Sequence, residues 1–142
     1  NRDAGFFLGQ QIGESIKNAE LFQGIDYLVP IPLHPNKEHI RGYNQSYVIA
    51  QGIEDKTRIP IAKDCLYRKV FTSTQTKKSR EERWDNVKEI FDINNHQKLI
   101  GKHILLIDDV LTTGATLLAA GKTLSQISDI KISAATAACT AG

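Results

Sequence analysis

The chain has 142 residues and a formal net charge of +2, from 18 Lys and Arg against 16 Asp and Glu. This length fits one domain, and an apolar content of 41% is enough for an ordinary buried core. The near balance of charge does not favour a protein that coats duplex nucleic acid, which would carry a basic stripe. No apolar run approaches the roughly 20 residues that cross a bilayer, so we predict no membrane partner.

Two cysteines, Cys65 and Cys139, lie far apart and neither belongs to a CxxC pair. We therefore expect no zinc site and no disulfide within the chain, and two buried thiols in a reducing cytoplasm are the simpler interpretation. The start at Asn1 lacks a basic region followed by an apolar one, so no signal peptide is visible. It also lacks an initiator Met. We expect residues 1–142 to form one domain, preceded by an upstream segment.

The predicted elements alternate between helix and strand. Hydrophobic periodicity and turn residues predict helices over residues 4–22, 44–53 and 115–126, and strands over 26–31, 64–71, 89–93, 102–107 and 131–139. The stretch 72–83 is polar and charged, and we predict an exposed loop there. Strands that alternate with helices favour an α/β domain, with a mostly parallel sheet and helices on both faces.

The most informative segment is ILLIDDVLTTGAT, at residues 104–116. A buried strand ends in Asp108 and Asp109, and a Thr-rich loop with Gly114 then enters a helix. The first turn of a helix offers unpaired N–H groups, and glycine permits close backbone approach. We therefore predict a nest for a phosphate dianion. Its residues are Val110, Leu111, Thr112, Thr113, Gly114, Ala115 and Thr116.

The two acids suggest what is attached to that phosphate. Adjacent acids fall on opposite faces if the strand continues, whereas at a strand-to-loop transition both can turn toward one ligand. Carboxylates accept hydrogen bonds from vicinal hydroxyls and hold Mg²⁺ directly or through water. A phosphate nest beside such acids predicts ribose 5-phosphate. The alternative is that Thr112 or Thr116 only caps the helix and the acids are solvated, which would explain either motif alone.

The segment resembles the signature of type I phosphoribosyltransferases. Two further blocks narrow the resemblance: VPIPLHP at 29–35 followed by IRGYNQ at 40–45, and TQT at 74–76 followed by Arg80, Arg83, Asn86 and Phe91. Their order and spacing resemble the ComF family of phosphoribosyltransferase-like competence proteins over nearly the whole chain. The resemblance implies binding of 5-phosphoribosyl 1-diphosphate with Mg²⁺. It also implies transfer of phosphoribose to a nitrogen acceptor, with release of pyrophosphate, in nucleotide metabolism or DNA uptake.

The resemblance also implies roles for single residues. Asp108 and Asp109 would fix the ribose hydroxyls, favour the developing cation and hold Mg²⁺ indirectly. The loop after Pro32, with Leu33 and His34, corresponds to the pyrophosphate loop. There Ile31–Pro32 or His34–Pro35 could be cis at low cost, although trans is the base-rate expectation.

The predicted cations belong to two segments. Asn44 and Gln45 would cap or line the site beside Arg41, which could equally be a surface residue before a glycine turn. The loop 72–83 corresponds to a catalytic loop that closes over pyrophosphate, although a charged loop is more often just solvated. The leaving group would be neutralised by Arg41, Lys77, Lys78 and Arg80.

These motifs do not establish that the chain catalyses a reaction. A second hypothesis is a non-catalytic module that senses phosphoribosyl diphosphate or contacts single-stranded DNA through the loop cations. A third, a structural partner with a vestigial site, is disfavoured by the complete acid pair and loop. The acceptor is not predicted, and single-stranded DNA, competence proteins and a second copy of the chain stay open as partners. Family members usually carry an N-terminal cysteine-rich zinc segment, which these residues lack.

Overall fold

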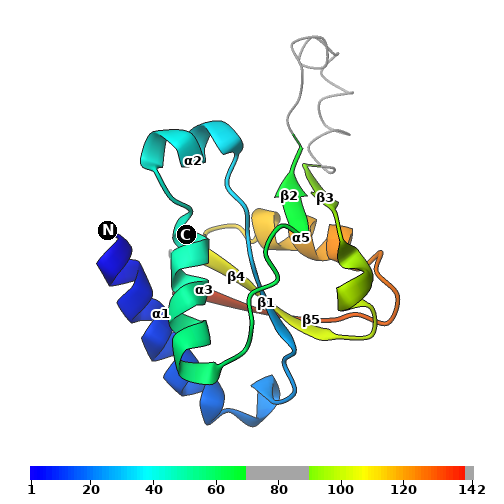
Figure 1. Cartoon of the computed structure of the whole chain (residues 1–142), viewed down its shortest axis with the longest axis horizontal. Helices are drawn as coiled ribbons and strands as arrows, with labels where there is room; N and C mark the ends of the chain where they lie inside the picture. The colour runs from blue at the N-terminus through cyan, green and yellow to red at the C-terminus, as the bar shows by residue number, and fades with distance from the viewer. Residues whose placement is uncertain (70–89, 140–142) are drawn as a thin grey trace.

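The computed structural model describes residues 1–69 and 90–139 (Figure 1). Its helices are α1 (Arg2–Lys17), α2 (Pro35–Arg41), α3 (Gln45–Thr57) and α5 (Ala115–Leu124), with short 3₁₀ turns η1 (Glu20–Phe22) and η3 (His96–Leu99). Its strands are β1 (Tyr27–Pro30), β2 (Leu66–Arg68), β3 (Phe91–Ile93), β4 (His103–Leu111) and β5 (Lys131–Cys139). The predicted loop 72–83 lies outside the described residues, with its Lys77, Lys78 and Arg80.

A three-stranded parallel sheet forms the centre of the molecule, in the order β1-β4-β5. Val29 of β1 is opposite Leu106 of β4, which is opposite Ala134 of β5. Strands β2 and β3 form a separate antiparallel pair. The predicted α/β architecture with a mostly parallel sheet is therefore confirmed, and β4 is its central strand.

Strands β1 and β4 bury side chains on both faces of the parallel sheet, since successive side chains of a strand point to opposite faces. Figure 1 shows α1 and α3 on one side of the sheet and α5 on the other. The first face packs residues of β1 and β4 against α1 and α3: Leu28, Leu105, Ile107, Ile16, Ile49 and Ile53. The second packs the alternate residues against α5 and the β2–β3 pair: Val29, Ile104, Leu106, Ala120, Leu124, Leu66 and Phe91.

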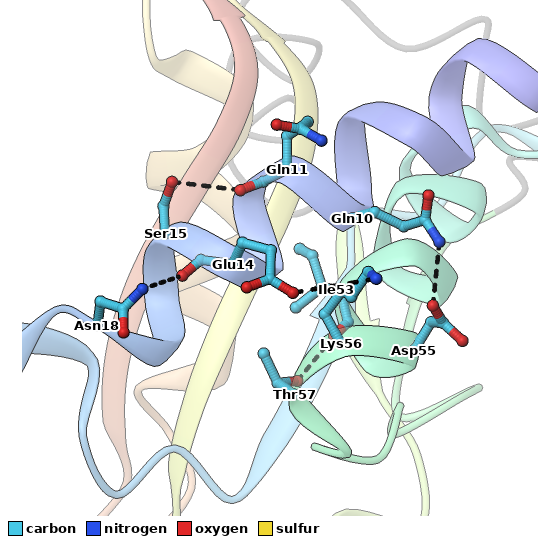
Figure 2. Close-up of polar contacts among 9 residues, drawn as sticks. All are labelled: Gln10, Gln11, Glu14, Ser15, Asn18, Ile53, Asp55, Lys56 and Thr57. Atoms are coloured by element: carbon cyan, nitrogen blue, oxygen red, sulfur yellow. Dashed lines mark hydrogen bonds and ion pairs between the residues drawn. The ribbon is translucent and has the colours of Figure 1, made fainter.

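Helices α1 and α3 approach closely at two glycines. A Cβ on Gly9 would overlap the carbonyl oxygen of Ile49, and a Cβ on Gly52 would overlap that of Phe6. Polar contacts flank this crossing, as Figure 2 shows. Gln10 Nε2 donates to Asp55 Oδ2 at 3.0 Å, and Lys56 Nζ lies 4.0 Å from Glu14 Oε1. Backbone contact through the glycines thus fixes α1 against α3.

The first helix is shorter than predicted. Helix α1 ends at Lys17, and a 3₁₀ turn over Glu20–Phe22 replaces the predicted last helical turns. Asn18 follows the helix, and its Nδ2 donates to the carbonyl oxygen of Glu14 at 3.1 Å. Apolar residues at helical spacing continue through this turn, so periodicity alone did not reveal where the helix stops.

Helix α2 was not predicted from the sequence. His34 caps it, because its Nδ1 accepts from the backbone N–H of Asn36 at 3.2 Å. Pro35 occupies the first turn, and Gly42 ends the helix in the left-handed region at φ 87°. Histidine is not among the common capping residues, so this start signal was weak.

Two further expectations concern the cysteines and the membrane. Cys65 is buried, as predicted, but Cys139 is exposed at the end of the edge strand β5, so the prediction of two buried thiols is wrong there. In the part of the chain that the structure describes, no helix is long and apolar enough to cross a membrane.

We predict that Gly52→Ala destabilises the chain by about 2 kcal/mol or more, because the added methyl forces α1 away from α3. The matched control is Gly121→Ala in α5, where an added Cβ meets nothing within 4 Å. That change should be neutral or stabilise by up to about 1 kcal/mol through helix propensity. Urea unfolding of both variants measures the difference, and equal effects would contradict the close approach.

Candidate functional site

Strand β4 is longer than predicted and includes both acids, Asp108 and Asp109. The predicted strand ended at residue 107, whereas β4 continues to Leu111, so the predicted end is wrong by four residues. The extension is held by β5, since Val110 is opposite Ala138 and Leu111 is opposite Cys139. Asp108 and Asp109 therefore leave opposite faces of the sheet. Asp108 is 8% exposed and Asp109 is half-buried.

Both acids nevertheless line one hollow of about 170 Å³ at the carboxyl ends of β1 and β4, which we call the acid-pair hollow. Its lining residues come from the loop after β1, the start of α3, the end of β2, strand β4 and the first turn of α5. They are Ile31, Pro32, Leu33, Arg41, Asn44, Gln45, Ser46, Arg68, Asp108, Asp109, Val110 and Thr116. Eight residues that the sequence placed at the site are thus brought together: Leu33, Arg41, Asn44, Gln45, Asp108, Asp109, Val110 and Thr116.

The predicted phosphate loop joins this hollow to α5. Gly114 precedes the helix in the left-handed region at φ 82° and supplies no side chain to cap it. Thr113 Oγ1 accepts from the N–H of Ala115 at 3.2 Å. Leu111, Thr112, Thr113, Gly114 and Ala115 do not line the hollow, and Thr112 and Thr113 are exposed beside it. Apart from the N–H of Ala115, the first turn of α5 has no side-chain cap, and a glycine before it is suited to anion binding.

The loop after β1 is tied to both neighbouring elements. The N–H of Ile31 donates to the carbonyl of Ile107 at 2.8 Å, so the parallel pairing extends one residue past β1. Asn44 Nδ2 donates to the carbonyl of Ile31 at 3.0 Å, while its Oδ1 caps α3 through the N–H of Ser46 at 3.0 Å. Asn44 therefore both caps a helix and lines the hollow, as the sequence suggested.

The other predicted residues of this loop are placed differently. Arg41 Nη1 donates to Gln45 Oε1 at 3.0 Å, and both residues line the hollow. His34 does not line it, and its ring is engaged in capping α2. The bonds Ile31–Pro32 and His34–Pro35 are trans.

Arg68 is a site residue that the sequence analysis missed. Its Nε donates to the carbonyl of Pro32 at 2.8 Å, and its guanidinium carbon lies 4.9 Å from the centre of the Phe91 ring. It also lines the acid-pair hollow beside Asp108. The signal that could have found it is an arginine in phase with buried Leu66 on the short strand β2.

The pKa of Asp108 is raised to about 6, first by burial and then by the neighbouring Asp109 carboxyl, while the Asp109 N–H and the Arg68 guanidinium oppose the shift. The same burial lowers the pKa of Arg68, although the Asp108 charge raises it. Asp108 is therefore half-protonated at about pH 6 and mostly ionised at neutral pH. A bound hydroxyl or cation would favour its ionised form.

The residues present fit an indirect Mg²⁺ site. Within residues 1–69 and 90–139, no group of three or more His, Cys, Asp or Glu side chains could hold a metal alone. The acid pair supplies two carboxylates at one hollow. Mg²⁺ typically binds through one or two carboxylates together with substrate phosphates and water.

We predict that Asp108→Asn stabilises the chain at neutral pH. The folded pKa lies above the ordinary value of 3.8, so ionisation costs stability as the pH rises from 3.8 to about 6. Asn removes this cost, and the gain relative to the wild type should grow from near zero at low pH to on the order of 1–3 kcal/mol above the folded pKa.

Urea unfolding without Mg²⁺ or ligand, across that pH range, measures the gain. Asp129→Asn is the control, because Asp129 is exposed between α5 and β5 and does not line the hollow. A stability difference that does not change with pH would contradict the burial of an ionisable Asp108.

Comparison with known proteins supports the predicted family. Residues 46–138 match the phosphoribosyl transferase domain family. Competence protein ComFC of Bacillus subtilis is 37% identical over 99 residues, which are 70% of this chain and 38% of that protein. The DNA utilization protein YhgH of Escherichia coli K12 is 30% identical over 92 residues, 65% of this chain and 40% of that protein. The chain thus spans less than half the length of these relatives.

A solved structure of similar fold is glutamine phosphoribosylpyrophosphate amidotransferase from Bacillus subtilis, complexed with ADP and GMP. It aligns with a TM-score of 0.66 at 18% identity, over 96% of this chain and 26% of that one. At this identity the likeness concerns the fold alone, which is that of the type I phosphoribosyltransferases. The chain therefore belongs to the phosphoribosyltransferase domain family, and its resemblance to the ComF competence proteins is confirmed.

Proposed function

We propose that this chain binds 5-phosphoribosyl 1-diphosphate with Mg²⁺ and transfers its phosphoribosyl group to a nitrogen acceptor, releasing pyrophosphate. The observation that carries the proposal is that Asp108 and Asp109 line one hollow together with Leu33 and Thr116. The acids lie near the end of β4 and Leu33 lies just after β1, at the carboxyl ends of adjacent parallel strands, where open α/β sheets bind ligands.

The 5-phosphate is assigned to the loop 112–116, where backbone N–H groups of the first turn of α5 and threonine hydroxyls can donate to it. The ribose hydroxyls then lie over the acid pair and donate to the carboxylates. The pyrophosphate faces the loop after β1, where Arg41 and Arg68 line the same hollow. The lining residues of this hollow include two arginines and two aspartates. The arginines can bind the negative charge that a phosphate-rich ligand brings.

In the proposed reaction, the lone pair of the acceptor nitrogen forms a bond to C1 of the ribose. The bond from C1 to the pyrophosphate oxygen breaks, and pyrophosphate leaves with that electron pair. A nitrogen that carries a hydrogen then loses its proton to water. Positive charge grows on the ribose ring as the bond breaks, and the carboxylates stabilise it electrostatically.

Mg²⁺, when bound, supplies positive charge to the pyrophosphate oxygens, and Asp108 and Asp109 are the residues that would hold it through water or substrate. The other roles in the reaction are assigned to residues of the chain itself. The phosphate loop anchors and orients the sugar. Arg68, together with Arg41, neutralises the leaving group. Lys77, Lys78 and Arg80 join this proposal from the sequence, since they lie outside the described residues.

We predict that calorimetry detects binding of phosphoribosyl diphosphate with Mg²⁺ to the wild type, with a dissociation constant in the millimolar range or tighter. The variant Asp108→Asn with Asp109→Asn should bind about 100-fold more weakly, because two charge-assisted contacts are lost. The control, Asp55→Asn with Asp129→Asn, makes the same change in net charge at exposed positions away from the hollow. No binding by the wild type, or equal binding by the double variant at the acids, would refute the site.

The relatives' names favour a second candidate, a DNA-associated module that does not turn over. ComFC is named as a competence protein and YhgH as a DNA utilization protein. In this case the loop cations would bind a single-stranded nucleic acid backbone, and the partners would be DNA or competence proteins.

The two candidates predict different results. The enzyme releases pyrophosphate with some member of a panel of nucleobases, amines and ammonia. The DNA-associated module releases none, and instead binds a single-stranded oligonucleotide more weakly as salt rises. Lys77→Ala with Lys78→Ala should abolish that binding. Coupled pyrophosphate release and oligonucleotide titrations at two salt concentrations decide between them.

A further inference from the structure

The segment 31–44 leaves the sheet after β1, forms α2 and returns to the start of α3, and we call it the connecting segment. Figure 1 shows α2 standing apart from the sheet, and none of its residues is buried. Ile40 on this helix is 85% exposed. The middle of the connecting segment therefore gains little from packing, so its conformation depends on how its two ends are held.

Both ends of the connecting segment line the acid-pair hollow, whereas the residues between them do not. The first end contributes Ile31, Pro32 and Leu33. The second end contributes Arg41 and Asn44. In the proposed function this wall of the hollow receives the pyrophosphate. The placement of one end against the other therefore sets the shape of the pyrophosphate side of the site.

A side-chain hydrogen bond joins these two ends. Asn44 Nδ2 donates to the carbonyl oxygen of Ile31 at 3.0 Å, although the two residues are 13 apart in sequence. Asn44 Oδ1 accepts from the N–H of Ser46 at 3.0 Å, and this bond caps α3. Helix α3 is itself packed against the sheet through Ile49 and Ile53. Asn44 therefore ties the first end of the connecting segment to a well-packed helix.

Peptide oxygens in this wall matter for an anionic ligand. A carbonyl oxygen carries partial negative charge, so one without a donor beside the hollow would repel the oxygens of a phosphate. The carbonyl of Ile31 accepts from Asn44, and the carbonyl of Pro32 accepts from Arg68 Nε at 2.8 Å. Two successive carbonyls of the wall are thus each bound by a side chain. The peptide between Ile31 and Pro32 has no N–H to offer the ligand, since proline lacks one.

From these contacts we infer that Asn44 is a positioning residue for the pyrophosphate half of the ligand. It holds the Ile31 carbonyl, and with it the first end of the connecting segment, in the arrangement that receives pyrophosphate. The inference rests on the proposed binding of phosphoribosyl diphosphate and adds a residue to that site. Arg68 acts on the leaving group directly, whereas Asn44 acts through the backbone. Binding of the 5-phosphate, assigned to the loop 112–116, does not use this contact.

The variant Asn44→Ser separates the two hydrogen bonds of this side chain. Serine caps helices about as well as asparagine, so the bond to Ser46 is kept. The serine side chain is one bond shorter, so the bond to the Ile31 carbonyl is lost. Calorimetry with Mg²⁺ measures the binding of pyrophosphate and of ribose 5-phosphate separately. Asn44→Ser should bind pyrophosphate at least 5-fold more weakly and bind ribose 5-phosphate with an unchanged dissociation constant.

Asn18→Ser is the matched control and should leave both dissociation constants unchanged. Asn18 Nδ2 also donates to a backbone carbonyl, that of Glu14 at 3.1 Å, but Asn18 does not line the acid-pair hollow. Unchanged pyrophosphate binding in Asn44→Ser would overturn the inference and leave the proposed function intact. An equal loss of both ligands would also overturn it, because it would show a general role in the fold. A wild type that binds neither ligand would overturn the proposed function as well.

Discussion

The site depends on a buried carboxyl at the point where the central strand of the sheet leaves the core. Asp108 follows four apolar residues of β4 that have almost no exposure, and it is itself only 8% exposed. A carboxylate at this position loses its hydration. The hydrogen bond from the Asp109 N–H and the charge of the Arg68 guanidinium compensate for this loss only in part. The raised pKa expresses this incomplete compensation. Hydrogen-bond donors or a cation on a ligand would complete the compensation of the Asp108 carboxylate. The buried acid therefore favours ligand binding at the expense of the stability of the fold.

The surrounding topology explains why the other groups gather at this carboxyl. Strands β1 and β4 are parallel neighbours, so their carboxyl ends meet, and the loop after β1 comes to lie beside the acids. Arg68 reaches the same point from the antiparallel pair, where Phe91 packs below its guanidinium. Its bond to the carbonyl of Pro32 links that loop to β2. One residue therefore connects the separate two-stranded sheet, the loop after β1 and the buried acid.

Much of this could be predicted from residues 104–116, since a buried strand, an acid pair and a glycine before a helix each have a local physical cause. The features that were missed depend on contacts between distant segments. Strand β4 continues to Leu111 because β5 pairs with it to Cys139, and no local signal shows that partner. Arg68 is brought to the site by tertiary packing. His34 belongs to a motif of the family, yet its ring caps a short helix, which a capping preference for Ser, Thr, Asp and Asn does not reveal.

The extension of β4 has a consequence for how the acid pair divides its work. Had the strand ended at residue 107, both carboxylates could have turned toward one side of a sugar. Because pairing with β5 keeps Asp109 in the strand, its side chain emerges on the α1 and α3 face, while Asp108 emerges toward α5 and Arg68. Both acids line the acid-pair hollow, but Asp108 leaves the strand toward Arg68 and α5, whereas Asp109 leaves it on the face that α1 and α3 cover. Two identical residues thereby acquire different surroundings, and this difference follows from the pleat of the sheet.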